Sequence, residues 1–134
     1  KIKPSVYEFL DDVRLAGVPT MIVTDLTSHI QYRKILLWRL DQYVDWITTS
    51  EEAATEKPNP AIFKYALSKL QGEDGPIWMI GDHPAKDLQG AKHALGAVTF
   101  QVINNNEKPS EFADVALKDF EELRGLFKRC QKAS

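Results

Sequence analysis

The sequence predicts an α/β fold with three layers (α/β/α), in which a parallel sheet lies between two layers of helices. Short, continuously apolar runs, typical of strands buried on both faces, alternate along the chain with segments of helical apolar spacing. Gly and Pro residues separate the two kinds of segment. This alternation is typical of parallel strands that are connected through helices.

The first half of the chain supplies two strands and two helices. Residues 4–16 carry Val6, Phe9 and Val13 at helical spacing, and Gly17 is a suitable residue to end that helix. The remaining elements expected there are a strand at 20–23, a helix at 30–40, a strand at 44–50 and a loop at 51–60.

The second half repeats the pattern. Asn59 and Pro60 form an N-cap and first-turn pair, which predicts a helix from there to about Leu70. The other expected elements are a turn at 71–76, a strand at 77–80, a helix at 88–95, a strand at 97–103, a short apolar segment at 114–117 and a helix at 119–129.

Length and composition fit one domain over residues 1–134, because 134 residues with 43% apolar content can form one core but hardly two. The net charge of −2 favours neither a nucleic acid nor a membrane surface as partner. No apolar run approaches the about 18 residues that span a bilayer. The single Cys130 cannot form an internal disulfide, which fits a reducing, cytoplasmic setting.

Polar residues follow the expected strands at the edge where such sheets bind ligands. Thr24 and Asp25 follow the first strand, and Asp82 follows the strand at 77–80. Lys57 lies in the loop after the strand at 44–50, and Pro58 behind it favours extended backbone. A hydroxyl, an ammonium and carboxylates at one edge suit an oxyanion beside a hard divalent cation.

Each of these residues also has a purely structural interpretation. Asp87 falls in the first turn of the next helix, where it suits the helix dipole whether or not it joins Asp82 at a metal. Lys57 could be solvated, and the Thr24 hydroxyl could bond its own backbone. Asp25 raises a further alternative, since it could be a nucleophile itself or only a neighbour of Thr24 as a phosphate ligand.

Taken together, these motifs resemble the haloacid dehalogenase-like superfamily of phosphotransferases, and most closely its phosphatases with a small helical cap. "MIVTD" is similar to the second family motif, with Asp25 where Asn is more usual. "TSEEAATEKPNPAIFKYAL" is similar to the third motif and contains Lys57. "GDHPAKDLQGAKHALG" is similar to the fourth and contains Asp82 and Asp87. The resemblance extends over residues 4–128 and implies a Rossmann-like core.

The first family motif, an apolar strand that ends in Asp-x-Asp and carries the nucleophile, has no counterpart in this sequence, and neither has the cap. In the family that strand lies inside the sheet, between the strands here at 77–80 and 20–24. We therefore expect an incomplete core whose sheet is completed by a missing N-terminal segment or by a partner chain, including a second copy in a homo-oligomer.

The resemblance implies a Mg²⁺-dependent phosphatase of small phosphorylated metabolites that works through an aspartyl-phosphate, with the nucleophilic Asp outside this chain. It implies catalytic roles for Thr24, Lys57, Asp82 and Asp87. It also places Thr24, Asp25 and Lys57 at the substrate, and Asp82 and Asp87 at the metal. Two alternatives stay open: a non-catalytic, truncated member that binds a phosphorylated ligand or a protein, and a haloacid dehalogenase. The chain by itself is expected to be inactive.

Overall fold

The computed structural model describes residues 2–25, 38–70, 75–103 and 106–133 and has the expected α/β architecture. Its strands are β1 (Met21–Thr24), β2 (Trp46–Thr49), β3 (Trp78–Gly81), β4 (Val98–Val102) and β5 (Val115–Leu117). Its helices are α1 (Pro4–Leu15), α3 (Ser50–Ala53), α4 (Pro60–Ser68), α5 (Gly90–Leu95) and α6 (Phe120–Ala133), with a short 3-10 helix η1 (Leu40–Gln42) and a π-helix η2 (Pro84–Gln89).

The described strands are all parallel to their neighbours, as predicted, but they form two sheets rather than one. β1 pairs with β2, and β3, β4 and β5 form the second sheet in that order. Within the described part of the chain, β1 and β3 are not hydrogen-bonded to each other. Each of these two strands therefore has a free edge.

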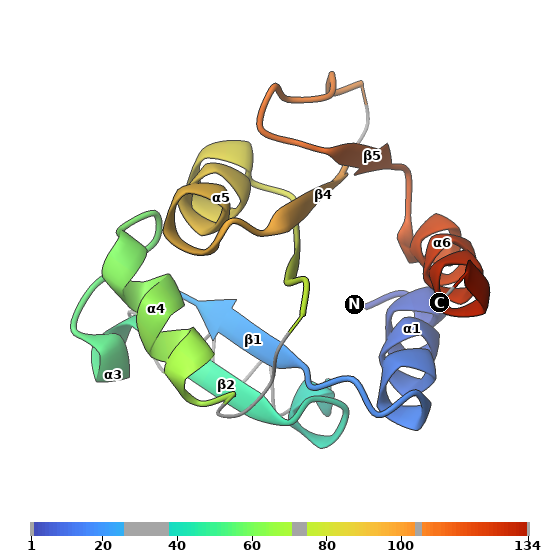
Figure 1. Cartoon of the computed structure of the whole chain (residues 1–134), viewed down its shortest axis with the longest axis horizontal. Coiled ribbons are helices and arrows are strands. Elements are labelled where there is room, and N and C mark those ends of the chain that lie inside the picture. Colours follow the sequence, from blue (N-terminus) through green and yellow to red (C-terminus); the bar gives the residue numbers. More distant parts are fainter. Residues whose placement is uncertain (1, 26–37, 71–74, 104–105, 134) are drawn as a thin grey trace.

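Helices cover both faces of the strands (Figure 1). α1 and α6 lie side by side on one face, and α4 and α5 lie together on the other. The two faces have separate cores because successive residues of a strand point in opposite directions. In β3, Trp78 and Ile80 pack against the cluster of α1 and α6, whereas Met79 packs against that of α4 and α5.

A cavity of about 800 Å³ runs between the two sheets. Its walls include Met21, Ile22 and Val23 of β1 and every residue of β3, and the helices of both faces line the rest with apolar side chains. Lys57 lies at its wall together with the residues that follow β3. The cavity therefore follows the free edges of β1 and β3 and extends to the residues that the sequence marks as functional.

Most predicted elements are confirmed within a few residues, and three differ. The expected loop at 51–60 begins with the short helix α3, because Thr49 and Glu52 form a reciprocal capping box. The helix that contains Asp87 starts earlier than expected, with the π-helical turn η2. The last helix continues beyond 129 to Ala133.

Three further features of the sequence can be compared with the structure. The helix expected at 30–40 lies mostly outside the described residues. Cys130 is exposed and free, as expected for a thiol without a disulfide partner. None of the helices in the described ranges is both long and apolar enough to span a bilayer.

Candidate active site

The five candidate residues lie at or beyond the carboxyl ends of the strands. Thr24 ends β1 and Asp25 follows it, while Asp82 comes directly after β3. Lys57 lies in the loop between α3 and α4, and Asp87 lies within η2. Parallel strands end at a common edge, which is why residues far apart in the sequence meet there.

Lys57 and Asp87 form an ion pair at the centre of this group. The Lys57 Nζ donates to Asp87 Oδ1 over 2.6 Å. Both side chains are largely withdrawn from solvent, with 13% and 9% of their surfaces exposed. A charge pair this buried is costly to disrupt, because either partner alone would remain as an uncompensated charge. The two residues thus hold each other at the strand ends.

The Asp87 carboxylate is fixed by its surroundings as well as by Lys57. Its Oδ2 accepts the main-chain N–H of His83 over 3.3 Å, and its own main-chain N–H donates to the His83 carbonyl over 2.8 Å. A Cβ on Gly81 would lie 2.5 Å from Asp87 Oδ2, so only glycine leaves room for this side chain. Asp87 is therefore held by the end of β3 on one side and by the π-helical turn on the other.

Asp25 contacts the loop between α3 and α4 through its side chain. This loop, residues 54–59, contains Lys57 and is called the lysine loop below. Asp25 Oδ1 accepts the main-chain N–H of Lys57 over 2.9 Å, and the pair is partly buried. The peptide bond from Lys57 to Pro58 is cis. One connected chain of contacts thus runs from Asp25 after β1, through Lys57 in the α3–α4 loop, to Asp87 in η2.

Asp82 and Thr24 are near this chain of contacts but are placed differently. Asp82 is exposed and lines the same cavity as Lys57 and Asp87. Thr24 is partly buried and stands opposite Thr49 in the parallel register of β1 and β2. Asp82 is consequently the carboxylate of the group that is most accessible to a ligand.

The carboxylates supply only part of a metal site. Asp82 offers hard oxygen atoms of the kind that Mg²⁺ prefers, whereas both Asp87 oxygens already accept hydrogen bonds. Among the described residues, no group of three or more His, Cys, Asp or Glu side chains is placed to hold a metal ion. The donor chemistry at Asp82 fits one ligand position of a divalent cation.

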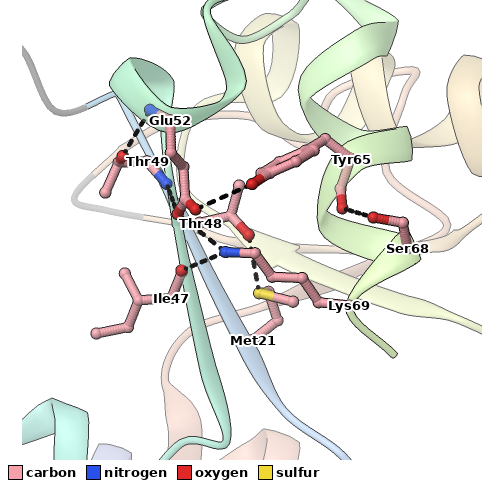
Figure 2. Close-up of polar contacts among 8 residues, drawn as sticks. All are labelled: Met21, Ile47, Thr48, Thr49, Glu52, Tyr65, Ser68 and Lys69. Carbon is pink, nitrogen blue, oxygen red and sulfur yellow. Dashed lines mark hydrogen bonds and ion pairs between the residues drawn. The ribbon is translucent and has the colours of Figure 1, made fainter. Parts of the chain in front are cut away.

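The base of the lysine loop is fastened by a network around Glu52 and Lys69 (Figure 2). The Lys69 Nζ lies between the Ile47 carbonyl and Glu52 Oε1, at 2.9 Å from each, and the Tyr65 hydroxyl donates to Glu52 Oε2 over 3.2 Å. Burial acts to raise the pKa of Glu52, but the hydrogen bonds from Lys69 and Thr49 outweigh it and hold that pKa below its usual value. Glu52 thus stays ionised at neutral pH and ties α3 to α4.

The five candidate residues were predicted from the sequence, whereas the contacts of two residues that support them were not. His83 contacts Asp87 only through the main-chain N–H and carbonyl of His83. The identity of the residue at position 83 therefore gives no sign of this role. Gly81 leaves room for the Asp87 side chain, which occupies the space that a Cβ at this position would take. A glycine between a strand and an acid pair was the available signal for that packing.

Comparisons with known proteins agree with this geometry. The model of the haloacid dehalogenase-like hydrolase family matches residues 1–102. The chain is 36% identical over 96 residues to a ribulose-1,5-bisphosphate 5-phosphatase of Halopiger xanaduensis, covering 72% of the chain and 40% of that relative. It is 26% identical to a glyceraldehyde 3-phosphate phosphatase of Methanocaldococcus jannaschii, covering 96% of the chain and 58% of that relative.

A solved structure shares the fold. The HAD phosphatase from Thermococcus onnurineus superposes with a TM-score of 0.84 at 28% identity, over 95% of this chain and 58% of the other. The chain therefore spans about half the length of the proteins that it matches. Because the family model covers most of the sequence, the chain belongs to the haloacid dehalogenase-like hydrolases.

Proposed function

We propose that this chain is the C-terminal core portion of a Mg²⁺-dependent phosphatase that acts on small phosphorylated metabolites. The observation that carries the proposal is the buried ion pair of Lys57 and Asp87, which lines the same cavity as the exposed Asp82. An ammonium fixed beside carboxylates at a sheet edge can stabilise a transferring phosphoryl group and hold a divalent cation near it.

Each residue then has a defined task. The Thr24 hydroxyl donates a hydrogen bond to a phosphoryl oxygen, and Lys57 offsets the negative charge of the phosphoryl group. A carboxylate from a segment outside this chain attacks phosphorus and displaces the alcohol, giving an aspartyl-phosphate that water hydrolyses. Asp87 holds Lys57 in place for this step, as the 2.6 Å contact allows.

Asp82 is the residue of this chain that we assign to Mg²⁺, with Asp87 beside it. When bound, the cation supplies positive charge that stabilises the developing charge on the phosphoryl oxygens. Asp82 contributes a hard, accessible oxygen, while Asp87 acts on the site through Lys57 and through its neighbours. The donors that this chain lacks belong to the same outside segment as the nucleophile.

We propose that this outside segment fills the cavity as a parallel strand between β1 and β3. Both strands have a free edge there, and the walls are apolar on the two faces, as a central strand requires. The occupant that we favour is a preceding segment of the same polypeptide, since the chain spans about half of its relatives. A partner chain or a second copy would complete the sheet with the same backbone chemistry.

The substrate class comes from the relatives. Those with similar sequences bear names such as glyceraldehyde 3-phosphate phosphatase and phosphoserine phosphatase, all of which describe small phosphate esters. Small metabolites and a lone exposed thiol also fit a cytoplasmic protein.

The decisive experiment uses a longer polypeptide that includes this chain and its preceding segment. We expect hydrolysis of p-nitrophenyl phosphate with Mg²⁺, loss of that activity in Asp82→Ala, and no loss in the control Asp41→Ala, an exposed aspartate of η1. Full activity of Asp82→Ala would refute the metal assignment. Phosphate binding without any hydrolysis would instead support the non-catalytic alternative.

A further inference from the structure

The Asp25 carboxylate is the least expected group at this site, because its charge lies next to the presumed position of a phosphate. The resemblance to the family implies that Asp25 lies at the substrate. In the structure, however, Asp25 Oδ1 accepts the main-chain N–H of Lys57 over 2.9 Å. This contact joins the residue after β1 to a loop that lies far along the chain.

Lys57 is therefore fastened at two independent points. Its main chain is held by Asp25, and its Nζ is held by Asp87 over 2.6 Å. The loop base is fixed separately by Glu52, which lies on α3 and bonds to α4. Of these contacts, the one with Asp25 acts directly on the backbone from which the lysine side chain projects.

We propose that Asp25 is a positioning residue that acts through Lys57 and not a ligand of the substrate; this inference rests on the proposed phosphatase function. A carboxylate that accepts a main-chain N–H forms a charge-assisted hydrogen bond, and the N–H dipole partly offsets the negative charge of the carboxylate. Its presence beside a phosphate site then has a physical reason. By holding the Lys57 main chain, Asp25 fixes the position of the Lys57 ammonium. A shift of about 1 Å at such a group can cost on the order of 100-fold in rate.

The first test measures amide hydrogen exchange of Lys57 by NMR, in the longer polypeptide with the preceding segment. Asp25→Ala removes the acceptor, so the Lys57 amide should exchange at least about tenfold faster. Asp25→Asn keeps an acceptor oxygen and should retain most of the protection. Unchanged exchange in Asp25→Ala would overturn the proposal.

Asp45 offers a matched control at the opposite end of the same two strands. Asp45 Oδ2 accepts the Thr20 main-chain N–H over 2.8 Å, a contact of the same chemical kind. Asp45→Ala should speed exchange at Thr20, leave Lys57 protected and leave activity unchanged. This pattern would show that the effect of Asp25→Ala is specific to the lysine loop.

The second test is kinetic and uses the same variants in two backgrounds. Asp25→Ala should lower kcat about 10- to 100-fold with little change in KM, and Asp25→Asn should recover activity to within about fivefold. In a Lys57→Met background, Asp25→Ala should cause no further loss, because its effect passes through Lys57.

Contrary results separate the possible failures. If the losses from Asp25→Ala and Lys57→Met multiply, or if Asp25→Ala raises KM while leaving kcat nearly unchanged, Asp25 contacts the substrate and the proposal is wrong. If the unsubstituted polypeptide hydrolyses no phosphate ester while the exchange results hold, the proposed phosphatase function fails and the anchoring of Lys57 stands.

Discussion

At the scale of single residues, the Lys57 side chain combines burial with charge in a way that is unusual for lysine. Lysines are almost never buried without a partner, and here the partner is the Asp87 carboxylate. The pair is surrounded by the end of β3, the turn η2 and the cavity. Changes at these residues should therefore affect both stability and chemistry.

The first prediction concerns Lys57→Met. Removing the ammonium leaves Asp87 buried and unpaired, so the free energy of unfolding should fall by about 3 kcal/mol. Phosphatase activity of the longer polypeptide should fall about 100- to 1000-fold as well, with a residual rate that remains measurable. Lys118→Met is the control, because its side chain is 88% exposed and should leave both quantities unchanged. Urea unfolding and p-nitrophenyl phosphate assays measure the two effects, and equal behaviour of the two variants would contradict the prediction.

The second prediction concerns Gly81→Ala. The new Cβ would lie 2.5 Å from Asp87 Oδ2 and 2.6 Å from Asp87 Cβ, so Asp87 must move. We expect a loss of about 1–3 kcal/mol in the free energy of unfolding, together with reduced activity.

Gly125→Ala is the matched control for that substitution. Gly125 lies within α6, and the nearest atom to an added Cβ is Arg129 Nη1 at 3.5 Å. Alanine in a helix interior should stabilise the protein by about 0.5–1 kcal/mol. Chemical unfolding compares the two variants, and a stability loss of similar size in both would show that the contact with Asp87 is not the cause.

At the scale of elements, the segment from α3 to α4 presents the lysine by means of two helix caps. Thr49 and Glu52 close a capping box at the start of α3. Asn59 then begins α4 by accepting the Ala61 N–H over 2.9 Å. These caps fix where α3 and α4 begin, and Lys57 lies between those two points.

The third prediction concerns the second of these caps. Asn59→Ala removes the acceptor for the first turn of α4 and should destabilise the protein by about 1 kcal/mol, whereas Asn59→Asp should preserve stability. Thermal or urea unfolding of the three proteins measures this. A loss in Asn59→Asp as large as that in Asn59→Ala would show that the cap is not the source of the stabilisation.

The fourth prediction concerns the contact between α1 and α6. Arg124 donates to both oxygens of Asp12, at 2.7 and 3.4 Å, and these hydrogen bonds hold the pKa of Asp12 below its usual value against the opposing effect of burial. A carboxyl with a lower pKa in the folded state stabilises the fold above its unfolded pKa of about 3.9 and loses that contribution as the pH falls through the folded value.

Stability measured from about pH 6 down to about pH 2 should therefore fall more steeply for the unsubstituted protein than for Asp12→Asn. The two curves should converge at the acid end, where Asp12 is protonated in both states. Asp11→Asn is the control and should nearly parallel the unsubstituted protein, because the Asp11 side chain is 42% exposed and its surface ion pair with Arg14 contributes little. A difference between Asp12→Asn and the unsubstituted protein that is constant over this range would contradict the prediction.

At the scale of the whole molecule, the cavity between the two sheets is the main feature. It has a volume of about 800 Å³, and its walls belong to both apolar cores. Well-packed proteins rarely contain apolar voids much larger than a water molecule. The cavity is therefore better explained as the place of another strand than as an internal hollow.

The fifth prediction follows from that assignment. The chain of residues 1–134 by itself should bind a hydrophobic dye such as ANS, since the cavity walls are accessible. The longer polypeptide, in which the preceding segment occupies the cavity, should bind far less. Fluorescence titration of both proteins at equal concentration measures this. Equal dye binding by both would contradict the placement of the strand.

Much of the fold was predictable because it follows from patterns among residues that are close together in the sequence. The alternation of buried strands and amphipathic helices fixes the α/β class, and the Asn59–Pro60 pair marks where α4 begins. The site residues were found because strand ends meet at one edge. What local rules missed were the main-chain contacts of His83 and the packing of Asp87 against Gly81, which involve atoms common to all residues.

The sequence by itself therefore determined the fold class and the family, and it indicated five candidate residues at the strand ends, because periodicity and motif spacing are local properties of the chain. Only the tertiary structure decided that Asp87 pairs with Lys57, that Asp25 holds the Lys57 main chain, and that the parallel strands form two sheets with a cavity between them. Those outcomes depend on which groups of distant elements come within bonding distance, and chain folding alone sets those distances.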